Sequence, residues 1–225
     1  MKKKTIAMLM ASVMLFGIAV GGTLAWITDT TGDVVNTFTV GDINIDLKEH
    51  DYDVDTNTLG TAEVTAEDEY KMIPGTTMPK DPFVRVEAGS EACWLFVKVV
   101  ETDNFDTYLT YEIDLYKEET NPDGWKVLDT TNYPGVYYRE VESLVNATSD
   151  SDPYYVLADN QVSVKEGVTK TQLEDFDGKD SNGASAPAEI TARPKLTFTA
   201  YAVQKAEVDT AMDAWEILFP PTTTN

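Results

Sequence analysis

Apolar and polar residues alternate with a period of two over much of this chain, and this alternation constrains the fold more than any other feature. The segment DINIDLKE places Ile43, Ile45 and Leu47 on one side of an extended chain, which is typical of a half-buried β-strand. YLTYEIDLY (108–116) repeats the pattern. ACWLFVKVVE (92–101) is apolar almost throughout, as expected of a strand covered on both faces. KLTFTAYAVQ (195–204) also alternates, and shorter strand candidates are PFVRVE, WKVLD, GVYYREV and QVSVKE.

The connections between these segments carry turn residues. IPGTTMPKDP (73–82) and NPDG (121–124) are rich in proline and glycine, which favour turns because they fix or free the backbone angle φ. Residues 49–70 and 174–189 are polar and weakly patterned, so we expect two long loops there.

One helix is expected near the C-terminus. EVDTAMDAWEILF has a one-sided apolar set, offers Asp209 as N-cap and is stopped by Pro220 and Pro221.

The many strand candidates and the single helix indicate an all-β fold class. We expect a two-sheet antiparallel sandwich of jelly-roll type with long loops and a short C-terminal helix. An immunoglobulin-like sandwich is the alternative.

The first 25 residues have the pattern of an export signal. Lysines at positions 2–4 precede an apolar run over residues 6–20, which is short against the ~20 residues needed to span a bilayer. Thr23-Leu24-Ala25 fits the small-x-small rule of signal peptidase. We expect cleavage between Ala25 and Trp26, so that the chain meets a membrane only through the signal peptide. Residues 26–225 would form a single domain, with 220–225 as a tail.

The charge balance excludes some partners. The chain carries 39 acidic and 17 basic residues, a net charge of −22, which repels nucleic acid and anionic membrane surfaces.

Cys93 is the only cysteine, so no intrachain disulfide can form. Its apolar neighbours predict a buried, inert thiol.

The sequence does not support an enzyme. His50 is the only histidine, whereas zinc proteases take two or three ligands from a motif such as His-Glu-x-x-His. No serine lies in a Gly-x-Ser-x-Gly motif. No cofactor is expected.

Two acidic clusters are weak candidates for binding calcium. They consist of Asp51, Asp53, Asp55 and Asn57, and of Asp175, Asp177 and Asp180. The first has the spacing of the first half of an EF-hand loop, but Thr56 replaces the glycine and Ala62 the final glutamate. Solvated acidic loops that hinder pairing at a sheet edge are the alternative.

Three stretches resemble the TasA/camelysin family, exported proteins of Gram-positive bacteria whose signal peptides are removed by a SipW-type peptidase. GGTLAWITDTTGDVVNTFTVGDINIDL resembles the family's N-terminus. The matching positions are Gly21, Gly22, Thr23, Ala25, Trp26, Ile27, Asp29, Asn36, Phe38, Gly41, Ile43 and Ile45. IPGTTMPKDPFVRVEAGSEACWLFVKV and LTFTAYAVQKAEVDTAMDAWEIL resemble a turn with a core strand, and the last strand with its helix. Residues 102–190 do not match.

The resemblance implies a secreted subunit of a biofilm matrix fibre. Its partners would be further copies of itself in a head-to-tail fibre, the SipW-type peptidase during export, and other matrix proteins. In such fibres the N-terminal strand inserts into the next subunit's sheet. Here residues 26–38 would be that strand, with Trp26, Ile27, Val34, Val35 and Phe38 as its apolar side chains. Members of the family have also been classed as peptidases. We do not expect that activity here, because the sequence lacks a zinc-protease pattern.

Strand insertion has a simple physical basis, and alternatives to it stay open. A free strand supplies N–H and C=O groups to an open sheet edge, and each large side chain that it buries contributes ~2 kcal/mol. While the signal peptide is attached the strand is tethered, so cleavage would trigger assembly. Residues 26–38 would otherwise pair within their own sheet. The protein would then be a cell-surface adhesin or accessory binding module, or, less favoured, a camelysin-like metalloprotease.

Overall fold

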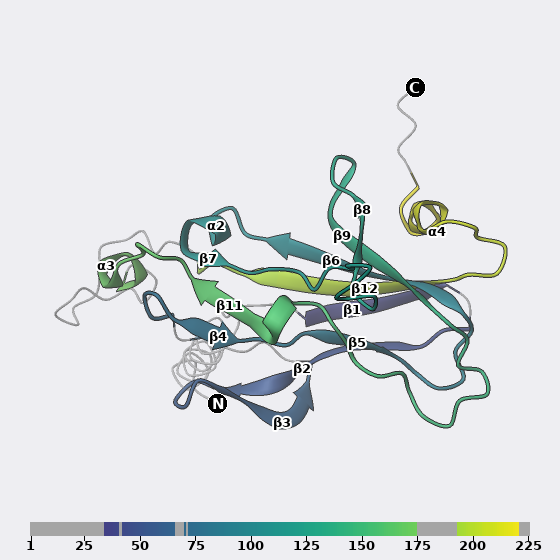
Figure 1. Ribbon diagram of the computed structural model, residues 1–225, viewed down its shortest axis with the longest axis horizontal. Helices are drawn as coiled ribbons and strands as arrows, with labels where there is room; N and C mark the ends of the chain where they lie inside the picture. The colour runs from purple at the N-terminus through teal and green to yellow at the C-terminus, as the bar shows by residue number, and fades with distance from the viewer. Residues whose placement is uncertain (1–33, 41, 66–69, 71, 175–192, 221–225) are drawn as a thin grey trace, which may run out of the picture. The chain divides into compact units, whose positions relative to one another are not determined.

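The computed structural model describes residues 34–40, 42–65, 70, 72–174 and 193–220, and all structural statements concern these residues. Within these ranges, no helix has both the length and the apolar character needed to cross a membrane. The strands of the described chain assemble into three sheets (Figure 1).

The largest sheet has five strands. Its spatial order is β1 (Val34–Val40), β12 (Leu196–Gln204), β6 (Cys93–Glu101), β9 (Tyr133–Val141) and β8 (Lys126–Asp129). All its neighbours are antiparallel except β1 and β12, which run in the same direction. The first and last strands of the described chain therefore lie side by side (Figure 1).

The remaining strands form two smaller antiparallel sheets. The second sheet has the order β10 (Tyr154–Tyr155), β5 (Phe83–Val86), β2 (Ile45–Asp53) and β3 (Thr58–Val64). The third has the order β4 (Thr77–Pro79), β11 (Gln161–Val164) and β7 (Leu109–Thr110). The short helices are α2 (Phe105–Tyr108), α3 (Lys170–Glu174) and a 3-10 turn (Ala158–Asn160).

The core lies between the first two sheets. Leu95 and Val97 of β6 and Phe198 of β12 are fully or almost fully buried in one cluster with Leu47 of β2 and Val84 of β5. Alternate residues of each strand face this layer because successive side chains of a strand point to opposite sides. The prediction of an all-β, antiparallel sandwich with a short C-terminal helix is confirmed.

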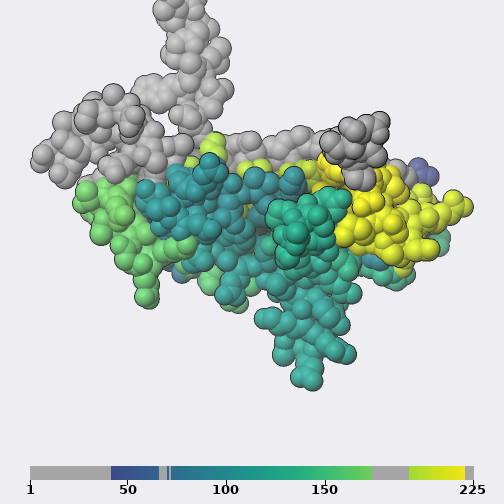
Figure 2. Space-filling model, turned by 90° about the horizontal axis from the view of Figure 1, so that it is seen from above, coloured from purple at the N-terminus to yellow at the C-terminus, as the bar shows by residue number. Residues whose placement is uncertain are grey.

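A second apolar cluster covers the outer face of the five-stranded sheet. Helix α4 (Ala211–Leu218) places Trp215 against Phe96 and Tyr201, with ring centroids 5.3 and 5.4 Å apart. In Figure 2 the α4 region (yellow) lies beside the β8–β9 region (teal). β6 is thus covered on both faces, as its apolar run predicts.

The N-cap of α4 is Thr210, and not Asp209 as the sequence predicts. The Thr210 Oγ1 accepts a hydrogen bond from the Asp213 amide.

Two predictions about secondary structure are wrong. Residues 49–70 do not form one loop, because β2 continues to Asp53 and a tight turn leads into β3. Conversely, 108–116 is not a continuous strand: β7 ends at Thr110, and only isolated bridges follow at Ile113 and Leu115. This segment leaves the sheet ladder to pack across the end of the core.

Candidate functional site: the parallel edge strand and a tyrosine pocket

Strand β1 lies at the edge of the five-stranded sheet and is the first strand of the described chain. Its backbone pairs with β12 from Thr37 to Val40, with Val40 opposite Val203. The register shifts between Val34 and Thr37, so its first residues follow β12 less regularly. An edge strand has a ladder on one side only, so β1 depends on β12 for its sheet hydrogen bonds.

β12 is a central strand only while β1 is present. On its other side β12 pairs with β6 over its whole length, from Leu196 to Gln204. If β1 left, the N–H and C=O groups of β12 that face β1 would lose their sheet partners. Without a strand in this position, β12 would itself be the sheet edge, open to pairing with a strand from the same chain or from another one.

The connection after β1 is firmly anchored. Ile43 is buried in the core, the Asp42 carbonyl accepts a bond from the Glu91 amide, and the Asn44 amide donates to Ser90 Oγ. These contacts fix the chain from residue 42 onward. β1 is consequently held at its C-terminal end by the body of the domain, independently of its pairing with β12.

The predicted strand-donation residues lie only partly within the described chain. Val34, Val35 and Phe38 belong to β1, where Phe38 is paired with Tyr201. Trp26, Ile27 and the cleavage position after Ala25 lie outside the described residues, as do Asp175, Asp177 and Asp180.

The first calcium candidate coincides with the turn between β2 and β3. Asp53 Oδ1 accepts bonds from the amides of Asp55 and Thr56, and these bonds hold the pKa of Asp53 below its usual range. Asp51 Oδ1 accepts from the Ala62 amide, and Asn57 Oδ1 from the Tyr52 hydroxyl. In the part of the chain that is described, no three His, Cys, Asp or Glu side chains are placed to hold a metal ion.

His50 and Cys93, the only histidine and the only cysteine of the sequence, both contact or lie within the body of the domain. His50 Nδ1 lies 2.6 Å from Asp81 Oδ2, and the His50 amide donates to Asp81 Oδ1. Cys93 is fully buried, and burial raises its thiol pKa to about 12. The thiolate is therefore scarce at neutral pH, in agreement with the prediction of an inert thiol.

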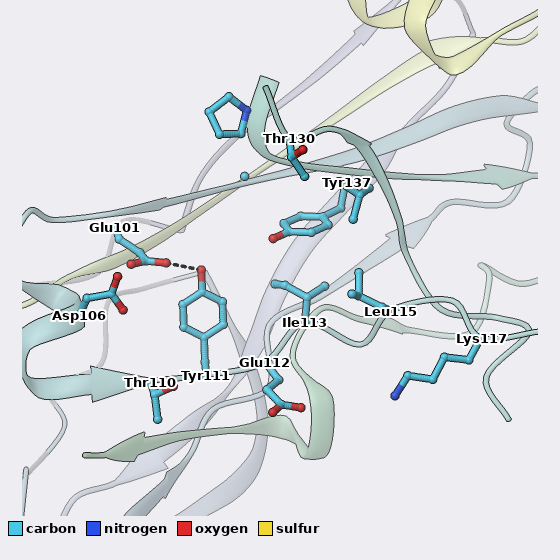
Figure 3. Close-up of a pocket in the computed structure, with 13 residues that line it drawn as sticks. Glu101, Asp106, Thr110, Tyr111, Glu112, Ile113, Leu115, Lys117, Thr130 and Tyr137 are labelled. Atoms are coloured by element: carbon cyan, nitrogen blue, oxygen red, sulfur yellow. Dashed lines mark hydrogen bonds between the residues drawn. The ribbon is translucent and has the colours of Figure 1, made fainter. Parts of the chain in front are cut away.

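A pocket of about 480 Å³ opens beside the end of β6, and sequence reasoning missed it (Figure 3). Its walls come from the end of β6, the segment after β7, and the β8–β9 region. Its lining includes Glu101, Asp106, Tyr111, Glu112, Ile113, Leu115, Lys117, Val127 and Tyr137. The pocket forms because the 108–116 segment departs from a regular strand, and no local pattern marks that departure.

Two tyrosines face this pocket. The Tyr111 hydroxyl donates to Glu101 Oε1 at 2.6 Å, and the Tyr111 ring packs edge-on against Phe105 with centroids 5.6 Å apart. Burial, followed by this bond to Glu101, raises the pKa of Tyr111. Tyr137 comes from β9, and its pKa is raised first by burial and then by Glu101. Both hydroxyls are protonated at neutral pH, as an ordinary tyrosine hydroxyl is.

Comparison of the chain with protein-family models, with curated proteins and with solved structures gives no match.

Proposed function

We propose that the chain is a secreted structural subunit of a bacterial extracellular matrix fibre, polymerising when its N-terminal strand segment enters the sheet of the next subunit. The observation that carries the proposal is the parallel pairing of β1 with β12 at a sheet edge. The resemblance of residues 21–47 to exported fibre proteins supports the same function.

The topology makes exchange of β1 simple. β1 precedes all other described strands and lies at an edge, so it leaves without passing through any other part of the sheet. Its place beside β12 accepts the same strand from another copy with the same hydrogen bonds. Each bond contributes ~1 kcal/mol net, but this gain is offset when the protein's own β1 already occupies the place.

In this proposal, the residues that precede β1 in the sequence favour exchange of the strand between subunits. In the proposed contact, residues 26–33 of one subunit would bury side chains against the next subunit. Trp26 and Ile27 are the large apolar side chains of this segment, and burying each contributes ~2 kcal/mol. Donor and acceptor are different surfaces, so the contact is head-to-tail and continues into a filament.

Signal-peptide cleavage is the trigger in this proposal. Before cleavage after Ala25, the segment that must enter the neighbour is tethered at its N-terminal end in the membrane. After cleavage it is free to move about the anchor at residues 42–44. The proposed polymer thus forms only outside the cell.

The experiment compares residues 26–225 with a chain that starts at Gly41. The shorter chain keeps Ile43 and the anchoring bonds but lacks β1. We expect filaments of the longer protein by electron microscopy and sedimentation, and none of the shorter one. A synthetic peptide of residues 26–40 should bind the shorter chain and leave it monomeric. If the shorter chain forms the same filaments, the N-terminal strand is not the donor.

A second candidate function is that of a non-polymerising adhesin or accessory binding module. The tyrosine pocket favours it, because its volume lies within the ~300–1,000 Å³ typical of small-ligand sites. Monomeric behaviour of the 26–225 protein together with retained ligand binding would favour this function over the fibre.

A further inference from the structure

We propose that the tyrosine pocket binds a non-acidic saccharide. The inference supplies a ligand class for the binding-module function, and it holds whether or not the chain polymerises. It rests on the arrangement of aromatic, aliphatic and carboxylate groups around one open space (Figure 3).

The tyrosine rings give the pocket its rigid walls. Tyr111 is fixed at both ends, by its hydroxyl bond to Glu101 and by its ring contact with Phe105. Tyr137 extends from the β9 backbone, which is paired with β6 on one side and β8 on the other. The two tyrosines thus come from elements far apart in sequence and are held in place before any ligand arrives.

The Tyr137 hydroxyl has unused hydrogen-bonding capacity. Among the described residues it makes no hydrogen bond, and it lines the pocket. A tyrosine hydroxyl carries its proton at neutral pH, so it can both donate and accept. A ligand hydroxyl group also donates and accepts, so it can form a hydrogen bond with the Tyr137 hydroxyl as either donor or acceptor.

Apolar and polar groups alternate around the rest of the lining. Ile113 and Leu115 are half-buried, and Val127 is 40% exposed. Glu112 and Lys117 are exposed beside them, and neither side chain makes a hydrogen bond within the described chain. A pyranose ring has the same mixed character, since its C–H faces pack on aromatic and aliphatic groups while its hydroxyl edge bonds to carboxylates and hydroxyls.

Charge excludes acidic sugars. Three carboxylates line the pocket, those of Glu101, Asp106 and Glu112, against the single ammonium group of Lys117. The whole chain carries a net charge of −22. A uronate or sulfated sugar would enter against this field, whereas a neutral sugar is indifferent to it and a protonated amino sugar is attracted.

The test titrates sugar trimers into the secreted protein by isothermal calorimetry. The probes are trimers of glucosamine, N-acetylglucosamine and galacturonate, together with Nα-acetyl-lysine methylamide as a mimic of a peptide lysine. We expect binding of one or both glucosamine-type trimers, weaker binding of galacturonate, and no comparable binding of the lysine mimic.

Matched variants connect the binding to this pocket. Glu112→Gln should weaken binding of the glucosamine trimer about tenfold, as expected for losing one hydrogen bond to a charged group. Tyr137→Phe should weaken binding of every trimer that binds. Glu118→Gln is the control, because it changes the charge equally at an exposed residue outside the lining.

Four results would overturn the proposal: no trimer binds, galacturonate binds as tightly as the others, the lysine mimic binds as tightly as the sugars, or Glu118→Gln weakens binding as much as Glu112→Gln. None of these results bears on filament formation, so failure here is distinct from failure of the fibre proposal.

Discussion

Lys80 Nζ lies 2.6 Å from Glu49 Oε2, and the two side chains are only 9% and 1% exposed. The Lys80 ammonium also lies 4.9 Å from the Tyr70 ring centroid and 5.8 Å from that of Phe198. Phe198 belongs to β12, so this buried ion pair packs against the strand that receives β1. Its charges are compensated within a largely dry layer, where an unpaired charge is costly.

Breaking this ion pair should destabilise the domain strongly. Lys80→Met leaves the Glu49 carboxylate buried without the Lys80 ammonium, and losses of about 3–5 kcal/mol accompany such changes. Urea denaturation at pH 7 measures the loss, and the double variant Lys80→Met/Glu49→Gln should recover much of it. Lys48→Met is the control, because Lys48 pairs with Asp46 at the surface and such pairs contribute about 1 kcal/mol or less. Equal losses in Lys80→Met and Lys48→Met would contradict this account.

The turn between β2 and β3 should weaken in acid. The amide bonds from Asp55 and Thr56 lower the pKa of Asp53 in the folded state. A carboxyl with a lowered folded-state pKa stabilises the fold above its unfolded pKa of about 3.9, and the contribution is lost as the pH falls through the folded value. NMR titration should show that Asp53 ionises at a lower pH than an ordinary aspartate does, and the Thr56 amide should be less protected from hydrogen exchange, relative to its intrinsic rate, at the acid end. Asp53→Asn should remove the pH dependence, and a titration at or above the ordinary value would contradict the prediction.

Helix α4 should depend on a single side chain. Trp215 is 3% exposed and packs against Phe96 and Tyr201, so Trp215→Ala should cost about 3–5 kcal/mol in the free energy of unfolding. Ile217→Ala on the same helix is the control, since Ile217 is 48% exposed and surface changes usually stay within ~0.5 kcal/mol. Denaturation followed by circular dichroism measures both variants. A loss for Trp215→Ala no greater than that for Ile217→Ala would show that the helix is not anchored in this way.

The elements that were predictable from sequence are those whose pattern reports burial directly. β6 is apolar over most of its length because the core lies on one side and the α4 cluster on the other. β2 alternates because only one face meets the core. The β2–β3 hairpin was missed because most of β3 is exposed, so no apolar alternation marks it, and the acidic residues of its turn resemble a loop.

Pairing between distant segments was not predictable in the same way. Nothing in the local sequence of β1 specifies a parallel partner at residues 198–203, because the partner of an edge strand depends on where the rest of the sheet ends. The same limit applies to Glu49 and Lys80, which are buried polar residues in segments that predict exposed charges. The tyrosine pocket depends on an irregular stretch of backbone, which residue periodicity cannot anticipate.

The central claim is that β1 of one subunit pairs with β12 of the next. Val40 and Val203 are paired across these strands, so we would prepare Val40→Cys and Val203→Cys as separate variants of residues 26–225 and mix them during assembly. Neither variant has a cross-strand partner cysteine within its own chain, and the native Cys93 is buried and inert. Mild oxidation followed by non-reducing electrophoresis and mass spectrometry measures the linkage. The account predicts disulfide-linked dimers that contain one chain of each variant. It would be contradicted if the mixture gave no such dimers while a chain carrying both substitutions closed the disulfide internally.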